Sequence, residues 1–265
     1  MSADVLNILV PMAGRGSRFA SAGYTLPKPL LPVFGRPMIE VVIDNIRPAR
    51  PHRFIFIAQR EHLEGHGLMP VLMRAGPDTR VIAIDGVTEG AACTTLLARG
   101  LIDNEASLMM ANCDQYVATQ IDDYLQAMDA SGLEGWIMTM SAADPKWSFV
   151  RLGSDGLARE VVEKQVVSNE ATVGIYNFRR GSDYVRAADA MVAAGDRTNG
   201  EFYVAPAYNY LLRAGGRVGC HNIGPDSAAM FGLGIPEDLL HFNRLPGVPL
   251  LRGAAATAVI PAVCE

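Results

Sequence analysis

The sequence lacks the features that mark several large protein classes. Its 265 residues include only four cysteines, Cys93, Cys113, Cys220 and Cys264, and none of them forms a C-x-x-C pair. Neither a disulfide framework nor a zinc site is indicated. No apolar run reaches the roughly 18 residues of a membrane span, and Asp4 stands where a secretory signal would carry basic residues. We therefore expect buried, reduced thiols and a cytoplasmic protein.

An excess of positive charge is also missing. The chain has 23 Lys and Arg against 28 Asp and Glu, a net charge of −5. Binding to nucleic acid or to an anionic membrane needs a positive surface, so we expect neither partner. Residues 1–60 are the exception, because they hold eight Lys and Arg but only three Asp and Glu. A small anionic ligand near this segment would match that charge.

Short apolar segments alternate with helical patterns along the chain. The pattern predicts strands at Val5–Met12, Phe54–Ala58, Val81–Ile84, Leu108–Ala111, Trp136–Met140, Ala171–Asn177 and Val218–Asn222. The first four of these are too continuously apolar to be half-exposed, so we expect both of their faces to be buried. The pattern predicts helices at Met38–Ile46, Ala92–Leu101, Asp122–Ala130, Ser182–Ala194 and Pro206–Ala214, and a last helix from Pro236.

This order predicts a single α/β domain over residues 1–245, with a mostly parallel mixed sheet flanked by helices in a Rossmann-like arrangement. The first part of the domain is expected to hold the small anionic ligand, and the second half looks like an acceptor-binding addition to the same domain. Residues 246–265 form an apolar tail, interrupted by Pro and Gly, to which we assign no function. Such sheets bind ligands beyond the carboxyl ends of their strands, so the site should lie there.

A glycine-rich turn follows the first strand. Residues 12–18 read M-A-G-R-G-S-R, and residues 27–32 read P-K-P-L-L-P. Glycines let the backbone turn its N–H groups toward phosphate oxygens, and Arg18 and Lys28 would offset the phosphate charge. A glycine-rich turn alone fits a tight strand-to-helix connection equally well. The spacing is neither G-x-G-x-x-G nor G-x-x-x-x-G-K-[ST], so neither dinucleotide nor P-loop chemistry is indicated.

Taken together, the two motifs resemble the signature of the nucleotidyltransferases that make nucleotide sugars, G-x-G-[ST]-R followed by P-K-P-[LM]-x-P. Residues 35–39, G-R-P-M-I, also resemble this family. The resemblance implies a single domain similar to the glycosyltransferase-A fold. It implies transfer of a nucleoside monophosphate from an NTP to a sugar 1-phosphate or similar phosphorylated acceptor, with release of pyrophosphate. Such enzymes most often serve surface-polysaccharide synthesis, and a homo-oligomer is left open.

The resemblance also assigns residues to the nucleotide. Arg18 and Lys28 would be the catalytic cations, and Gly90 would lie near the base. Asp85 stands where thymidylyl-transferring relatives carry Gln. An ionised Asp only accepts hydrogen bonds, which suits CTP or GTP, although Asp85 could equally cap a surface turn. The full nucleotide set implied by the resemblance is Ala13, Gly14, Arg15, Gly16, Ser17, Asp85, Glu89, Gly90 and Asn112.

Metal and acceptor sites follow from the same resemblance. Asp114, after the fourth strand, would hold Mg²⁺, which prefers oxygen ligands. Residues 162–165, V-E-K-Q, resemble the family's Glu-Lys-Pro, although Gln165 replaces the Pro. Glu163 would bind acceptor hydroxyls and Lys164 the acceptor phosphate. Gly174 and Glu201 would complete the acceptor site, although Glu201 also suits a helix N-terminus.

One departure from the family pattern concerns the metal. Relatives with two metal-binding carboxylates carry W-x-D-x-G-T-P-E, whereas Gly232 occupies the position of that Asp in this chain. Either a neighbour such as Asp226 substitutes, or the metal depends on Asp114, phosphates and water. Gly232 also motivates a second hypothesis, a regulatory subunit that binds nucleotide without catalysis. A glycosyltransferase of the same fold would need D-x-D, and residues 112–114, N-C-D, lack the first Asp.

Overall fold

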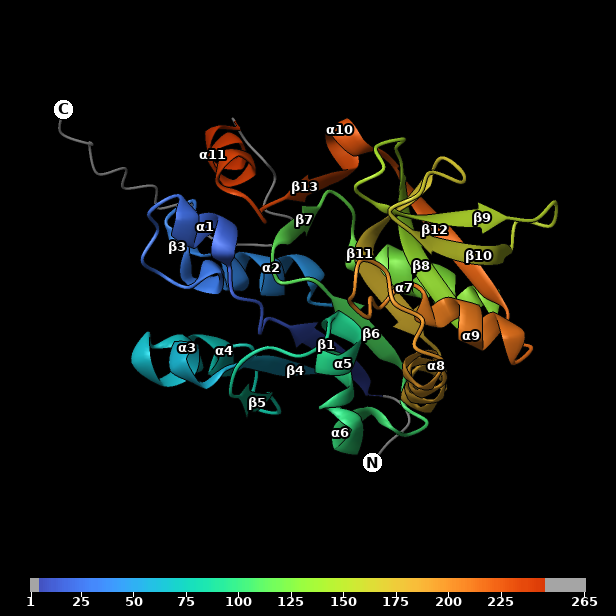
Figure 1. Cartoon of the computed structure of the whole chain (residues 1–265), viewed down its shortest axis with the longest axis horizontal. Helices are drawn as coiled ribbons and strands as arrows, with labels where there is room; N and C mark the ends of the chain where they lie inside the picture. The colour runs from blue at the N-terminus through green and yellow to red at the C-terminus, as the bar shows by residue number, and fades with distance from the viewer. Residues whose placement is uncertain (1–4, 246–265) are drawn as a thin grey trace.

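A nine-stranded sheet forms the centre of the fold, which the computed structural model describes over residues 5–245 (Figure 1). Its parallel half consists, in order across the sheet, of β5 (Arg80–Ile84), β4 (His52–Gln59), β1 (Leu6–Pro11) and β6 (Leu108–Ala111). In the second half, β11 (Glu170–Phe178) runs antiparallel to β6 and pairs with β8 (Gly135–Ser141) and β9 (Ser148–Leu152). β10 (Ala158–Glu163) pairs with β9, and β12 (Val218–Pro225) runs parallel to β8.

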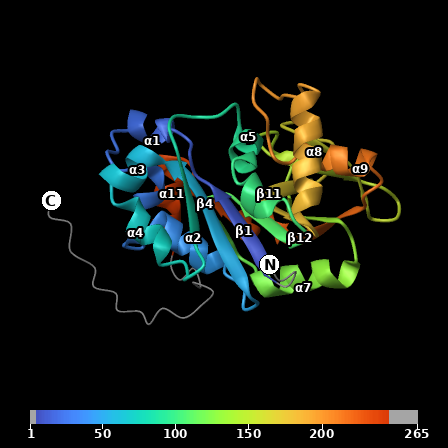
Figure 2. The same cartoon turned by 90° about the horizontal axis from the view of Figure 1, so that it is seen from below.

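Helices cover both faces of this sheet (Figure 2). One apolar core lies under α2 (Met38–Ile46), α3 (Arg60–Gly65), α4 (Leu68–Met73), α7 (Ile121–Ser131) and α11 (Pro236–Arg244). The other lies under α5 (Ala91–Leu96), α6 (Arg99–Ile102), α8 (Gly181–Ala193) and α9 (Ala207–Arg213). The remaining helices are short: α1 (Ser17–Ser21), α10 (Asp226–Ala229) and the 3₁₀ turn η1 (Lys28–Leu30).

The continuous apolar sequence of β1 serves both cores. Ile8 and Val10 point into the first core, and Leu9 points into the second. All three side chains are fully buried, as expected of an inner parallel strand. β4 and β6 alternate in the same way. The apolar runs of β1, β4 and β6 therefore fix the middle of the sheet.

The predicted fold class, a mixed and mostly parallel sheet flanked by helices, is confirmed. The expectation that Val81–Ile84 is buried on both faces is wrong, because β5 is the edge strand and its side chains are half-buried or exposed. The single helix predicted at Ala92–Leu101 is divided into α5 and α6. Leu97 and Ala98 donate hydrogen bonds three residues back, to Thr94 and Thr95, which tightens the chain between the two helices.

Two small antiparallel ladders lie outside the main sheet. One joins β2 (Pro32–Val33) to β3 (Arg36–Pro37), directly after the P-K-P-L-L-P motif. The other joins β7 (Gln115–Val117) to β13 (Met230–Gly232). The second ladder brings the region of the missing carboxylate, Gly232, directly opposite Gln115. It therefore ties the last part of the described chain to the segment that follows β6.

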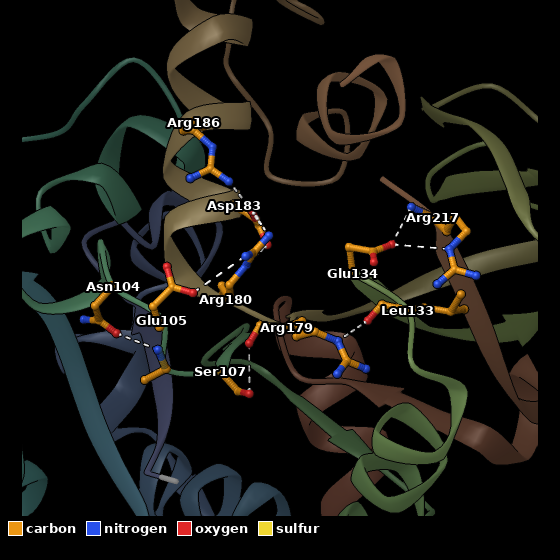
Figure 3. A network of polar contacts seen from close by, with 11 residues as sticks. Asn104, Glu105, Ser107, Leu133, Glu134, Arg179, Arg180, Asp183, Arg186 and Arg217 are labelled. Atoms are coloured by element: carbon orange, nitrogen blue, oxygen red, sulfur yellow. Dashed lines mark hydrogen bonds and ion pairs between the residues drawn. The ribbon is translucent and has the colours of Figure 1, made fainter. Parts of the chain in front are cut away.

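A polar network closes the end of the sheet at which β6 begins (Figure 3). Asp183 at the start of α8 is buried, and its carboxylate accepts hydrogen bonds from Arg180 and Arg186. Ser107 donates to the carbonyl oxygen of Arg179, whose guanidinium bonds to that of Leu133. These contacts connect β6, β8, β11 and α8, so we assign the network a structural role.

The remaining expectations concern cysteines, membrane spans and the tail. Cys113 is buried, whereas Cys93 and Cys220 are half-buried, and all three are free thiols. Within residues 5–245, no helix combines the length and the apolar character needed to cross a bilayer. The expected tail, residues 246–265, lies outside the described residues together with Cys264.

Candidate active site

The loops that follow β1, β5 and β6 enclose a cavity of about 610 Å³, here called the loop cavity. They come together because the carboxyl ends of parallel strands lie at one edge of a sheet. The loop cavity is lined by Pro11, Met12, Ala13, Gly14, Arg15, Lys28, Pro29, Val87, Thr88, Gly90, Ala91, Thr94, Asn112, Cys113, Asp114 and Glu201.

The glycine-rich loop forms one wall of this cavity. Gly16 adopts a left-handed conformation, with φ of +61°, immediately before α1 begins. Glycine reaches this conformation at little cost, which explains its place in the turn. The amide of Gln59 donates to the carbonyl oxygen of Ala13 over 2.8 Å and so fixes the start of the loop. Gly14 and Arg15 are exposed and face the cavity.

Lys28 and Asp114 form an ion pair in the loop cavity. The Nζ atom of Lys28 donates to Oδ2 of Asp114 over 2.8 Å, and the two side chains are only 20% and 25% exposed. Lys28 is positioned by η1, which begins after Pro27 and contains Pro29, and prolines restrict the backbone of such a turn. The P-K-P motif therefore presents one fixed cation to the carboxylate that follows β6.

The surroundings keep Lys28 charged. Burial and the charge of Arg18 lower the pKa of Lys28. A larger rise comes from the Cys113 thiolate, which forms only at alkaline pH, and from the charge and hydrogen bond of Asp114. The net result is a pKa above the ordinary value for lysine. Burial raises the pKa of the Cys113 thiol to about 11, so this thiol stays protonated at neutral pH.

Gly90 joins the wall of the loop cavity to a distant part of the chain. Its φ is +132°, and a Cβ atom placed on it would lie 2.5 Å from the backbone N and O atoms of Phe202. Phe202 donates its N–H to the carbonyl oxygen of Glu89, and Ala92 donates to that of Phe202. These bonds bring Glu201 into the wall of the loop cavity. Glu201 thus lines the same cavity as Lys28 and Asp114, and its assignment to the acceptor stays a prediction.

A second cavity, of about 280 Å³, lies between β6, β9, β10 and β11 and is here called the strand cavity. Glu163 lines it and is half-buried, and the Ser148 hydroxyl donates a hydrogen bond to its carboxylate. Burial raises the pKa of Glu163, while the bond from Ser148 and the charge of Lys164 oppose the rise. The two cavities share Pro11, Ala91 and Asn112, so they are neighbours.

Lys164 lies beside the strand cavity rather than in its lining. Its backbone is left-handed, with φ of +56°, and its Nζ atom donates to the Tyr203 hydroxyl over 2.7 Å. The ammonium also lies 4.7 Å from the centre of the Tyr203 ring, a cation–π contact. Tyr203 itself lines the strand cavity. Lys164 is therefore held near the cavity mouth.

The structure brings most of the predicted residues to the two cavities, and several lie outside. The loop cavity collects Ala13, Gly14, Arg15, Lys28, Gly90, Asn112, Asp114 and Glu201, and the strand cavity collects Glu163 and Gly174. Gly16, Ser17 and Arg18 follow the loop at the start of α1 but are outside the lining. Glu89 is exposed and ion-paired with Arg197.

Asp85 is not brought to either cavity. Its carboxylate is 77% exposed and accepts a hydrogen bond from Nε of Arg60 over 3.0 Å. This ion pair links the end of β5 to α3 on the surface. The alternative that Asp85 serves a surface turn therefore agrees with its position, and its recognition of the base stays a prediction.

The place of the missing second carboxylate is faced by a different acid. A Cβ atom on Gly232 would lie 3.4 Å from Oδ2 of Asp238, which belongs to the first turn of α11. Leu233 donates its N–H to the carbonyl oxygen of Asp114 over 2.8 Å, so this segment is fastened to the metal-ligand candidate. Asp226, the substitute considered from the sequence, is exposed on α10. No three His, Cys, Asp or Glu residues converge within residues 5–245.

Several lining residues have no assignment from the sequence. Thr88 and Thr94 bond to each other over 2.6 Å, and both hydroxyls reach the carbonyl oxygen of Gly90. In the strand cavity, Gln115 and Trp147 line the wall. Gln115 directly follows Asp114, but its burial depends on distant segments and gave no signal in the sequence. The threonines carried no signal, because Thr is common at helix starts.

Comparison with known proteins agrees with this geometry. A sequence profile described as Nucleotidyl transferase matches residues 8–201. The chain belongs to the nucleotidyl transferase family. The matched range includes the glycine-rich loop, Lys28, Asp114 and Glu163. Most residues that line the two cavities therefore lie within the matched segment.

Curated relatives of this nucleotidyl transferase family member share between a quarter and a third of their aligned residues with it. The bifunctional protein GlmU of Paraburkholderia xenovorans is 29% identical over 222 residues, covering 79% of this chain and 45% of GlmU. GlmU of Paracidovorax citrulli is 26% identical over 256 residues, covering 91% and 50%. The chain thus spans about half the length of these curated relatives.

Solved structures share the fold. The nucleoside-diphosphate-sugar pyrophosphorylase of Vibrio cholerae superimposes with a TM-score of 0.76 at 24% identity, covering 90% of this chain and all of that one. A candidate glucose-1-phosphate thymidylyltransferase of Bacillus anthracis, solved with sucrose, gives 0.70 at 18% identity and covers 90% and 94%. At these identities the likeness establishes the fold alone.

Proposed function

We propose that the chain transfers a nucleoside monophosphate from an NTP to a sugar 1-phosphate or a similar phosphorylated acceptor, with release of pyrophosphate. The observation that carries the proposal is the Lys28–Asp114 pair beside the glycine-rich loop, in a cavity that adjoins a second one holding Glu163. The first cavity offers a cation and backbone donors to a triphosphate. The second offers hydrogen-bonding groups to hydroxyls, and the product would be a nucleotide sugar for surface-polysaccharide synthesis.

The reaction needs positioning and charge compensation more than proton transfer. An acceptor phosphate oxygen is already ionised at neutral pH, so it attacks the α-phosphorus in line while pyrophosphate leaves on the opposite side. Lys28 would stabilise the triphosphate charge, Arg18 the departing pyrophosphate, and Lys164 the acceptor phosphate. The loop N–H groups from Ala13 to Ser17 would cradle the phosphates. No base or nucleophilic side chain is required.

Asp114 places a carboxylate in the lining of the loop cavity, and a divalent cation bound there would share this carboxylate with the ammonium of Lys28. Oxygen ligands of this kind suit Mg²⁺. When bound, Mg²⁺ supplies charge neutralisation at the α-phosphate. The Asp238 carboxylate, 3.4 Å from the position of a Gly232 Cβ, is a second candidate acid beside Asp226, and both are exposed.

Residues in and near the loop cavity bear on the choice of nucleotide base. CTP or GTP follows from Asp85, whose carboxylate is bonded to Arg60 outside the loop cavity and would have to turn toward the base. Thr88 and Thr94 line the cavity itself and offer neutral donors and acceptors. Use of UTP or dTTP would contradict the role of Asp85 and favour the two threonines.

Pyrophosphate release tests the proposed function. The purified chain is incubated with Mg²⁺, each of the four NTPs or dTTP, and a panel of sugar 1-phosphates and small phosphorylated acceptors. We expect release with one nucleotide and one acceptor class, and none when either is omitted. Nucleotide binding without release across the panel would support the regulatory alternative, which Gly232 motivates.

The two arginines near the loop provide a sharper prediction. Arg15 lines the loop cavity, whereas Arg18 is exposed on α1 outside it. We expect Arg18→Ala to lower turnover about 10- to 100-fold without changing the melting temperature, because the side chain is exposed. If Arg18→Ala keeps the wild-type turnover and Arg15→Ala loses turnover, then Arg15 rather than Arg18 stabilises the departing pyrophosphate.

A further inference from the structure

Gln115 is a buried amide in the wall of the strand cavity. It begins β7, is 4% exposed, and lies directly opposite Gly232 of β13. Its Oε1 atom accepts a hydrogen bond from Nδ2 of Asn112 over 3.1 Å. Its Nε2 atom is buried and has no hydrogen-bond partner among residues 5–245. Buried donors are nearly always paired in proteins, so this N–H group needs a ligand atom.

A glycine makes room for the amide pair. Gly174 has a φ of +76°, and a Cβ atom on it would lie 2.2 Å from Nδ2 of Asn112 and 2.6 Å from Oε1 of Gln115. The carbonyl oxygen of Gly174 also accepts the N–H of Asn112 over 3.2 Å. Any side chain at 174 would displace both amides. The orientation of Gln115 is therefore built into the backbone of β11.

The charges around the strand cavity define what this donor faces. Glu163 supplies a carboxylate acceptor, and Ser148 donates to it. The two nearby lysines lie over aromatic rings, Lys146 at 4.8 Å from the Trp147 ring centre and Lys164 over Tyr203. The lining thus pairs an amide donor with a carboxylate acceptor. Hydroxyl groups satisfy both. A ligand carboxylate would instead meet the acceptor Glu163, while Lys146 is ion-paired with Asp144 and Lys164 donates to the Tyr203 hydroxyl.

We infer that Gln115 is a specificity-determining residue, which donates its Nε2 hydrogen to a hydroxyl oxygen of an uncharged, polyhydroxylated acceptor group bound in the strand cavity. The acceptor phosphate stays outside, toward the loop cavity, and a second hydroxyl donates to Glu163. This inference rests on the proposed function and adds to it the chemistry of the acceptor. A strand cavity of this kind would accept neutral sugar phosphates in preference to uronic acid phosphates.

The test separates donation by Gln115 from a structural role. Gln115→Glu keeps the shape and removes the donor, and Gln126→Glu, on the exposed face of α7, is the matched control. With the acceptor identified by pyrophosphate release, we expect Gln115→Glu to raise the KM for the acceptor about 10- to 100-fold. The KM for the NTP should stay unchanged, whereas the melting temperature should fall, because the substitution buries a carboxylate. Gln126→Glu should match the wild type.

Monodeoxy analogues of the acceptor locate the bond. The analogue that lacks the partner hydroxyl should react equally well with the wild type and with Gln115→Leu, because neither makes the bond. An unchanged acceptor KM in Gln115→Glu, or an equal rise in both KM values, would overturn the inference.

Failure of the proposed function is a separate outcome. If the wild type releases no pyrophosphate with any pair of nucleotide and acceptor, the role of Gln115 can still be tested by itself. Calorimetry then measures the binding of neutral sugar 1-phosphates. Binding that Gln115→Glu weakens, and that glucuronate 1-phosphate does not show, would support the inference. Absent binding, or binding that the substitution leaves unchanged, would reject it.

Discussion

Replacing Lys28 by Met is expected to lower the rate of pyrophosphate release by about 100- to 1000-fold, the loss typical when one preorganised charge-stabilising group is removed. Lys28 carries its charge at neutral pH and lies in the loop cavity beside Asp114. Negative charge moves onto the leaving pyrophosphate during the reaction, and a fixed cation in a partly buried site stabilises it more than water does. Lys28→Arg keeps the charge and should retain more activity than Lys28→Met.

A stability measurement must accompany this result, because Lys28→Met also leaves Asp114 without its cation. Both side chains are partly exposed, so we expect the free energy of unfolding to fall by only about 1–3 kcal/mol. Arg99→Met is the control, since it removes the Arg99–Asp189 ion pair far from the cavities. A folded Lys28→Met protein with near-wild-type turnover would refute the catalytic role.

Gly90→Ala is expected to cause the largest loss of stability among the single substitutions considered. The φ of +132° is strained for alanine, and the new Cβ atom would lie 2.5 Å from backbone atoms of Phe202. Strain and overpacking together should lower the free energy of unfolding by about 2–5 kcal/mol. For a domain of this size, the melting temperature would fall by roughly 10 °C. Nucleotide affinity should fall too, because Gly90 lines the loop cavity.

Gly100→Ala is the matched control for this prediction. Gly100 lies in α6 and has no left-handed φ, and a Cβ atom placed on it would have no neighbour within 4 Å. Alanine favours helix over glycine by up to about 1 kcal/mol, so stability should stay constant or rise. Thermal unfolding followed by circular dichroism measures both variants. Equal melting temperatures for Gly90→Ala and the wild type would show that the Phe202 contact adjusts freely.

The middle of the fold could be predicted from the sequence because its signals are local. The apolar runs of β1, β4 and β6 identify inner strands, and the two motifs after β1 mark Lys28 and the glycine-rich loop. Asp114 follows the same logic, since it comes directly after an inner parallel strand. These elements could be predicted without knowing which distant segments of the chain contact each other.

Other features depend on contacts between distant segments and could not be predicted. Asp85 is paired with Arg60, which no local pattern indicates. Glu201 reaches the loop cavity only because Phe202 is hydrogen-bonded to Glu89. β5 has the composition of an inner strand but lies at the sheet edge, since its burial depends on strand order. Gln115 becomes notable only once Asn112 and Gly174 surround it.

The division of the site into two cavities affects how substrate specificity can change between related proteins. The loop cavity is built mainly on the parallel strands and the strand cavity mainly on the antiparallel ones, and within residues 5–245 only Pro11, Ala91 and Asn112 line both. Under the proposed function, substitutions in β9, β10 or the segment before β9 would therefore alter acceptor choice while nucleotide affinity is retained. The two cavities could then change independently. Asn112 lines both of them, so a single substitution there would alter both cavities at once.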